Sequence, residues 1–478
     1  MRNATSTTIQ SGDAQTSAWS FWLWFASALS LVLIMVVVAT AWAVRSTLNE
    51  ESRIPETGSR LFMRLANFPE LVLTAIQQVQ SQFEGDPLPL LMDRKEIEKA
   101  HWVRRFPAPE DSGYLLFSGV DPAAKRSVVQ IIRIADGTVI ARWNPDWPAI
   151  YAQVASKGLT HVGGPNVARA FHPVLLDDGD IIFNNDTSLI RMSSCSPRPV
   201  WVLDDVMHHS NDLDLDGSLW VPSVSKDGLT ENPWLNDRIQ DNALAHVSTG
   251  GRVLDKQSFA RILRNNGLQA MLLGTSGHQL NKDPIHLNEI RIAQQSGRHW
   301  QRGDLLISAR HLSTVFLYRP STGKILWHQT GPWMNQHSAD FVDDQRISVF
   351  DNNVVSGAPK EHAFLLPGDT NRVLLYDFDT GQALQPFAAL LAETRPITIT
   401  EGRARVLPDG GLFVEETNYG RQLRFTRDRL LWSRVNDYDA KRIGMVSWSR
   451  YLTAEEARVP LQALTTRHCP ANTSAAKE

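Results

Sequence analysis

The stretch "HHSNDLDLDGSLWVP", from His208 to Pro222, contains two short apolar runs on either side of an Asp-Gly dipeptide. Leu213 and Leu215 alternate with aspartates before the dipeptide, and Leu219 opens a second apolar run after it, as expected for two strands around a turn. Asp-Gly is typical of a tight turn between strands, because glycine adopts backbone angles that other residues avoid. The stretch therefore predicts strand, turn and strand.

A calcium site is the competing interpretation of the same residues. Asp212, Asp214 and Asp216 followed by Gly217 have the spacing of the first half of an EF-hand loop. The twelfth position of such a loop needs a bidentate glutamate, and here it is Ser223. The flanking pattern also predicts strands and not helices, so we interpret the aspartates as one face of a strand that leads into the turn.

The same pattern recurs along the chain. It appears in "FHPVLLDDGDIIF" (171–183), "QHSADFVDDQRISVF" (336–350) and "RARVLPDGGLFV" (403–414), and a second hairpin such as "STVFLYRPSTGKILWHQTG" (313–331) follows in several cases. Two hairpins make four antiparallel strands, which is one blade of a β-propeller. The alternative, a pair of β-sandwiches, fits a repeated unit less well.

Counting these units predicts an all-β fold, a six-bladed β-propeller over residues 113–478. The units begin near Gly113, His172, His209, His286, His337 and Arg403, and the third carries an insertion around 226–245. The tail "RIGMVSWSRYL" (442–452) could supply the strand that closes the ring.

The N-terminal part predicts a membrane anchor. After a disordered leader (1–18), the segment from Phe21 to Val44 has no charge over 24 residues, so 19–44 predicts a transmembrane helix. A secretory signal peptide is the alternative, since Ala39-Thr40-Ala41 resembles a cleavage site. Residues 45–112 predict a short helical stalk and a linker. Basic residues after the span favour a body inside the cytosol.

Charge and cysteine content narrow the possible partners and compartment. The net charge is −3, which argues against a broad nucleic-acid surface. The two cysteines, Cys195 and Cys469, could form one disulfide in an oxidising compartment or remain two thiols, and neither has the neighbours of a zinc site.

Three units begin with a histidine at the same blade position: His209, His286 and His337. The first strand of each blade lines the central channel, so these side chains should converge at one mouth. Arg310 falls on the second strand of the fourth unit, and the next residue, His311, should point to the opposite face. Converging imidazoles suit a metal site or an oxyanion site, and a nearby arginine favours the oxyanion.

The ordered motifs "HHSNDLDLDG", "IHLNEI", "ISARHLS", "GPWMNQHSADF" and "VFDNN" resemble the bacterial arylsulfate sulfotransferases. The resemblance implies an exported six-bladed propeller that moves a sulfuryl group from an aryl sulfate ester to a phenolic acceptor, without cofactor or metal. It implies that His337 is the nucleophile that forms a sulfo-histidine and that His209 is the acid/base. The residues it implies at the sulfuryl oxygens and the substrate mouth are His286, Arg310, Asn288 and Tyr419.

Several alternatives stay open. His208 adjoins His209 and could take the acid/base role or bind substrate. The propeller could instead be a non-catalytic, membrane-anchored binding scaffold, or a metal-dependent hydrolase on the same fold. Because members of the family are exported, the resemblance implies that the propeller lies on the periplasmic or extracellular side of a single-pass anchor. The basic residues after the span predict the opposite orientation.

Overall fold

The computed structural model describes residues 27, 29–32, 34–39, 41–42, 87–156, 167–203, 205–225, 236, 239–274, 282–355, 364–366 and 369–469. The chain forms two compact units, 1–80 and 81–478. Half of the predicted span (19–44) and residues 45–86 of the predicted stalk and linker lie outside the described residues. Within the described part, no helix is both long and apolar enough to cross a membrane.

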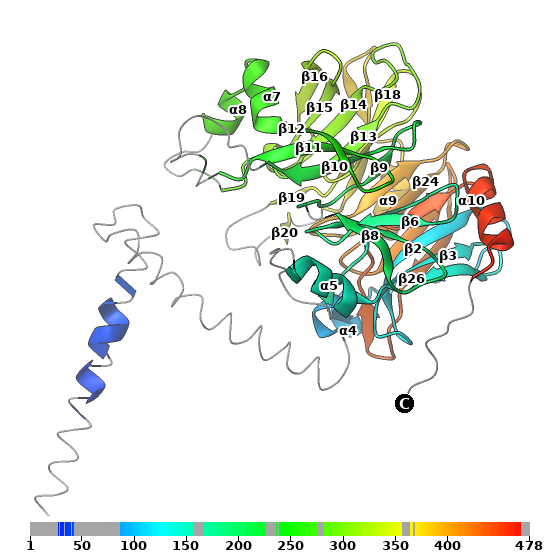
Figure 1. The fold of residues 1–478 in the computed structure, drawn as a ribbon, viewed down its shortest axis with the longest axis horizontal. Coiled ribbons are helices and arrows are strands. Elements are labelled where there is room, and N and C mark those ends of the chain that lie inside the picture. The colour runs from blue at the N-terminus through cyan, green and yellow to red at the C-terminus, as the bar shows by residue number, and fades with distance from the viewer. Residues whose placement is uncertain are drawn as a thin grey trace, which may run out of the picture. The chain divides into compact units, whose positions relative to one another are not determined.

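The second unit contains six four-stranded antiparallel sheets, which confirms the predicted propeller (Figure 1). From the innermost strand outward, the first three blades are β28 (Arg450–Leu452), β2 (Tyr114–Asp121), β3 (Arg126–Arg133), β4 (Val139–Trp143); β5 (Phe171–Leu175), β6 (Ile181–Asn184), β7 (Leu189–Met192), β8 (Pro199–Leu203); and β9 (Asp212–Leu213), β10 (Leu219–Val224), β11 (Asn242–Val247), β12 (Val253–Ser258). The other three are β13 (Leu287–Ile292), β14 (Leu305–Ala309), β15 (Thr314–Arg319), β16 (Lys324–Thr330); β17 (Ala339–Phe341), β18 (Arg346–Asp351), β21 (Arg372–Asp377), β22 (Gln382–Leu384); and β23 (Arg403–Val406), β24 (Leu412–Glu416), β25 (Arg421–Phe425), β26 (Leu430–Val435).

The C-terminal tail closes the ring, as its sequence predicts. β28 pairs antiparallel with β2, with Tyr114 opposite Leu452, so the last strand of the chain is the innermost strand of the first blade. β27 (Arg442–Gly444) pairs with β1 (Leu91–Asp93) outside the blades. The remaining small sheet joins β19 (Val354–Val355) to β20 (Phe364–Leu365).

Among residues 87–469, the described parts include short helices that lie between or beside the strands. They are η1 (Leu88–Leu90), α4 (Arg94–Ile97), α5 (Trp147–Ser156), α7 (Phe259–Asn265), α8 (Ala270–Leu273), η3 (Arg310–Leu312), α9 (Ala388–Thr394) and α10 (Ala454–Thr466). α10 begins with a capping box between Thr453 and Glu456. A disulfide between Cys195 and Cys469 ties the chain after α10 to the second blade.

Among the described residues, six apolar clusters fill the spaces between neighbouring blades, one for each pair. A seventh, smaller cluster joins Ile97 and Trp102 to Val435 and Ile443. β24 shows how the sequence builds the clusters between blades. Leu412 and Val414 face the cluster shared with the fifth blade, while Phe413, between them, faces the cluster shared with the first blade. Both faces of a blade are buried, so apolar side chains occupy both faces of the strand.

The Asp-Gly motif of the third blade is a turn, as predicted. The amide of Gly217 donates to the carbonyl of Asp214 at 3.1 Å, and Gly217 has a φ of 81°, which favours glycine. The expectation that the three aspartates share one strand face is wrong, because β9 ends at Leu213 and Asp214 and Asp216 lie in the turn. The predicted insertion is also shorter than 226–245, since β11 begins at Asn242.

Candidate functional site

The predicted histidines meet at one end of the channel, just before the innermost strands begin. His209 precedes β9, His286 precedes β13, and His337 precedes β17. His209 and His286 have left-handed backbones, with φ of 59° and 53°. Such a conformation costs about 1 kcal/mol or more for a residue other than glycine, and it is found disproportionately at functional sites. The rings of His209 and His286 lie 5.0 Å apart.

His208 orients His209. Their Nδ1 atoms lie 2.8 Å apart, and Nε2 of His208 lies 3.4 Å from the carbonyl of Ser223. A proton on Nε2 of His208 satisfies that carbonyl, so Nδ1 of His208 accepts and Nδ1 of His209 donates. This leaves the Nε2 lone pair of His209 without a hydrogen-bond partner within the described residues. His209 is therefore the better placed of the two for proton transfer.

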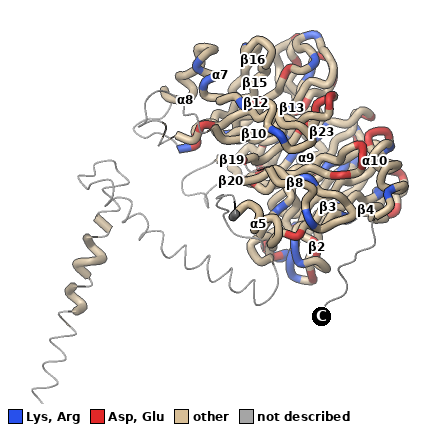
Figure 2. The backbone as a smooth tube through the Cα atoms, in the orientation of Figure 1, with Lys and Arg blue, Asp and Glu red and all other residues tan. Residues whose placement is uncertain are grey.

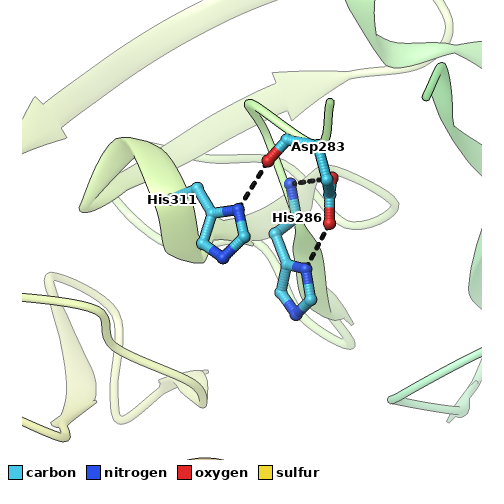
Figure 3. Close-up of side chains that lie close together, drawn as sticks. All are labelled: Asp283, His286 and His311. Carbon is cyan, nitrogen blue, oxygen red and sulfur yellow. Dashed lines mark hydrogen bonds and ion pairs between the residues drawn. The ribbon is translucent and has the colours of Figure 1, made fainter. Parts of the chain in front are cut away.

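Asp283 holds two further imidazoles (Figure 3). Its carboxylate accepts from Nδ1 of His286 at 2.5 Å, and its backbone carbonyl accepts from Nδ1 of His311 at 2.5 Å. The rings of His286 and His311 stack at 4.3 Å. Nη1 of Arg310 lies 3.0 Å from Nε2 of His311 and completes this group.

The expectation that His311 faces away from the site is wrong, and Arg310 is not on a strand. β14 ends at Ala309, and Arg310, His311 and Leu312 form a 3-10 turn. Side chains alternate between faces only within a strand, so the rule fails at this point. The ring of His311 therefore stacks on His286, and the side chain of Arg310 contacts His311.

His337 is fixed at both ring nitrogens. Nδ1 lies 2.6 Å from the side-chain carbonyl of Asn352, and Nε2 accepts from the amide of Glu401 at 2.9 Å. Asn352 is itself held, because its amide donates to the carbonyls of Thr398 and Glu401. The proton of neutral His337 is therefore on Nδ1, and its lone pair is on Nε2.

Trp448 forms the wall that joins these rings. It lies 5.6 Å from His209, 6.2 Å from His337 and 5.0 Å from His172, measured between ring centroids. It is 2% exposed and occupies, in the first blade, the position just before the innermost strand β28. Its place in the tail motif could have indicated this role, because the histidines stand just before their own innermost strands.

Burial keeps the central imidazoles neutral. Burial, and next the charge of His208, holds the pKa of His209 well below its usual value. Burial and then Arg310 do the same for the pKa of His337. Burial and His286 lower the pKa of His208 and of His311 to about 4. For Asp283, burial acts in the opposite direction, but the hydrogen bond from His286 keeps its pKa below the usual value.

Two predicted substrate-binding residues lie in other environments. Asn288 is fully buried, and its amide donates to the carbonyl of Gln336 at 2.8 Å. Tyr419 packs against the apolar cluster that contains Ile97 and Trp102. Among the described contacts, neither residue touches the imidazoles.

Among the described residues, two groups of side chains have the spacing to hold a metal ion. Asp283, His286 and His311 present ligand atoms within 4.8 Å of one another, and so do Asp214, Asp216 and His246. In the first group both Nδ1 atoms already bond to Asp283, and Arg310 contacts His311. In the second group, the Ser218 hydroxyl lies 2.5 Å from both Asp216 and His246.

Comparison with known proteins gives one family. The sequence model described as "Arylsulfotransferase (ASST)" matches residues 172–436, more than half of the chain. No curated protein matches the chain significantly.

Solved structures of similar fold are distant. A Bacteroides caccae protein of unknown function is 12% identical (TM-score 0.42, 72% of this chain and 99% of that one). Kuenenia stuttgartiensis hydrazine synthase is 10% identical (TM-score 0.37, 70% and 80%). A streptogramin B lyase is also 10% identical (TM-score 0.33, 73% and 87%). All three scores are below 0.5, so these structures contribute nothing to the assignment of function.

Proposed function

The chain belongs to the arylsulfotransferase family, and on that premise we propose that it transfers a sulfuryl group from an aryl sulfate ester to a phenol through a sulfo-histidine at His337. The observation that supports this most is the set of imidazoles held with their protons on Nδ1 beside Arg310. Neutral imidazole is a competent nucleophile and base near pH 7, and Arg310 supplies the positive charge that sulfuryl oxygens need.

In the first half-reaction, Nε2 of His337 attacks sulfur, an N–S bond forms, and the S–O bond to the aryl group breaks. The electron pair leaves on the phenolate. The lone pair that attacks is the one that accepts from the Glu401 amide in this structure, so that hydrogen bond has to be given up. Once sulfur occupies Nε2, the same N–H lies close enough to donate to a sulfuryl oxygen, as in an oxyanion hole.

In the second half-reaction, the acceptor phenol loses its proton to Nε2 of His209 and its oxygen attacks sulfur. The N–S bond breaks and returns the electron pair to His337. Because burial lowers the pKa of His209, its Nε2 is unprotonated and open to accept this proton, which it then releases to solvent or to the departing phenolate. Asp283 accepts from Nδ1 of His286 and so fixes the orientation of that ring beside the transferring group.

The test is sulfuryl transfer from an aryl sulfate to a phenol, with wild type and His337→Ala. Wild-type turnover with loss in the variant supports the proposal, and equal rates in both refute it. Mass spectrometry of quenched reactions should find an adduct of about 80 Da on the peptide that contains His337. An adduct on His209 in its place would reassign the nucleophile. Stoichiometric binding without turnover would favour the scaffold.

A metal-dependent hydrolase is the other candidate, because Asp283, His286 and His311 could hold an ion. The charge of Arg310 at 3.0 Å from His311 opposes a cation there. Metal analysis of untagged protein, with activity measured after chelation, distinguishes the two. Transfer that disappears on chelation and returns with one metal would favour the hydrolase chemistry.

We also propose that the propeller lies outside the cytosol, anchored through residues 19–44. The disulfide between Cys195 and Cys469 supports an oxidising compartment, since such bonds are rare in the cytosol. A reporter fused to the C-terminus tests this side of the membrane. Reporter activity confined to the cytosol would overturn the orientation.

A further inference from the structure

The opposite end of the channel holds a cavity of about 670 Å³. Residues of all six innermost strands line it: β5, β9, β13, β17, β23 and β28. Arg403 and Arg450 are the first residues of β23 and β28. α10 contributes Glu456 and Pro460 to the rim. None of the imidazoles of the candidate site lines the cavity, so it is a second site. Figure 2 shows basic and acidic residues interspersed along the propeller backbone.

Four arginines line this cavity, and two of them are neutralised by carboxylates. Arg291 contacts Asp212 at 2.5 Å, Asp340 at 3.2 Å and Glu289 at 3.3 Å. Asp212, Asp340 and Glu289, the acidic side chains that lie deeper than the rim, therefore all contact Arg291.

Arg405 is the second neutralised arginine. It pairs with Glu456 of α10 at 2.5 Å. Asp343 and Asp344 stand at the exposed rim and pair with Arg346 and Arg298 on the outside.

The other two arginines, Arg403 and Arg450, have no carboxylate within 4.0 Å among the described residues. Arg403 is 2% exposed, and its Nε and Nη1 are buried without a hydrogen-bond partner. Arg450 is half-buried, and its hydrogen-bond partners within the described residues are neutral groups. Nε donates to the carbonyl of Pro173 at 2.7 Å, and Nη2 donates to Nδ1 of His172 at 2.7 Å and to the carbonyl of Asn211.

Among the described residues, Arg403 and Arg450 are therefore held without a direct ion pair. The carboxylates that act on them, chiefly Glu289 with Asp340 for Arg403 and Asp212 for Arg450, do so from beyond 4.0 Å. Burial, then the charge of Arg403, lowers the pKa of Arg450 to about 9. Burial, then Arg291, lowers the pKa of Arg403. A buried charge without a partner is costly, and so are buried N–H donors without acceptors. A ligand that brings both negative charge and acceptor oxygens removes both costs.

We propose that this mouth binds a doubly charged tetrahedral oxyanion, of the sulfate and hydrogen phosphate class, between Arg403 and Arg450. Two negative charges match the two guanidinium groups that make no direct ion pair with a described carboxylate. Oxygen acceptors match the unpaired Nε and Nη1 of Arg403, and guanidinium presents such donors in a fork that fits oxyanions. Asp212, Asp340 and Glu289 disfavour larger polyanions, because they surround Arg291 beside the same cavity.

The experiment is a calorimetric titration of the full chain with sulfate and with phosphate. Wild type should bind saturably, and Arg403→Met should weaken binding at least about tenfold, the loss of one charge-assisted interaction. Arg133→Met, which removes an exposed arginine paired with Asp136 on the outside of the first blade, is the matched control and should bind like wild type.

A second variant separates the two ends of the channel. Arg310→Met removes the cation of the imidazole site and should leave binding at the far mouth unchanged. Affinity lost in Arg310→Met and kept in Arg403→Met would overturn the proposal, as would the absence of saturable binding.

Crystals of wild type soaked in selenate test the proposal if Arg403→Met does not fold. An anomalous peak within hydrogen-bond distance of Arg403 supports the site. A peak only at the imidazoles, or none, refutes it.

Discussion

Replacing Asp283 by asparagine should slow sulfuryl transfer because it removes the charge that supports His286. The carboxylate accepts from Nδ1 of His286 at 2.5 Å, and the side chains of the pair are 26% and 23% exposed. A hydrogen bond to a charged group in such a setting is worth about 1.5–3 kcal/mol. If this energy is expressed in the transition state, kcat should fall by about 10- to 150-fold in Asp283→Asn.

The measurement is a double-mutant cycle in initial rates at saturating aryl sulfate. His286→Gln should lose at least as much as Asp283→Asn, and the double variant should be no slower than His286→Gln, because the carboxylate acts through that imidazole. If the fold-losses in rate of the two single variants multiply in the double variant, this reasoning is refuted. Wild-type rates in Asp283→Asn would refute it equally.

Two controls isolate the effect. Asp343→Asn makes the same change in an exposed ion pair with Arg346, at 2.5 Å, and should leave kcat within about twofold. Thermal unfolding of Asp283→Asn is needed as well, because the carboxylate also accepts from the amide of His286 and from Asn242. A lower melting temperature with unchanged kcat would assign Asp283 a structural role alone.

Three further outcomes are expected. The pKa of His208 is about 4 in the folded chain and near 6.5 in the unfolded chain, so the unfolded chain binds more protons below pH 6.5. The contribution of His208 to the free energy of unfolding is therefore complete above pH 6.5 and falls by about 2 kcal/mol between pH 7 and pH 5. Urea unfolding of wild type and His208→Gln at both pH values measures this difference. Peptide mapping without reductant should find Cys195 linked to Cys469, and because 274 residues separate them, Cys195→Ser should lower the free energy of unfolding by up to about 5 kcal/mol; unlinked peptides in native protein would contradict this. Because His209 is neutral and a poor acid, donors with more acidic phenols should react faster, and rates independent of the leaving group would place the acid elsewhere.

The sequence predicted the propeller because each blade repeats the same local pattern. Alternating apolar residues around Asp-Gly turns mark the hairpins, and a turn such as that at Gly217 depends only on neighbouring residues. The convergence of His209, His286 and His337 followed from the same repeat, because equivalent positions in equivalent blades face one channel. The repeat of equivalent blades was therefore enough to predict both the propeller and the convergence of these three histidines.

The partners of these histidines could not be predicted, because the repeat does not position them. Asp283 lies in the segment before β13. Glu401, whose amide donates to His337, follows that histidine by 64 residues in the chain. The position of His311 was predicted wrongly because the prediction extended the strand through His311, whereas β14 ends at Ala309. The length of a strand depends on tertiary hydrogen bonding, and one residue changes the face of a side chain.

The protonation pattern explains why these imidazoles fit a sulfuryl group better than a metal ion. His286 and His311 each donate from Nδ1 to Asp283, and His337 is oriented by Asn352, so their lone pairs sit on Nε2. Lone pairs alone would suit a metal. Here, however, the lone pair of His311 faces Arg310, and that of His337 faces a backbone N–H. A cation placed among them would have to displace both donors and withstand the charge of Arg310. An anionic group uses the same donors, Arg310 and the backbone N–H of Glu401, as they stand.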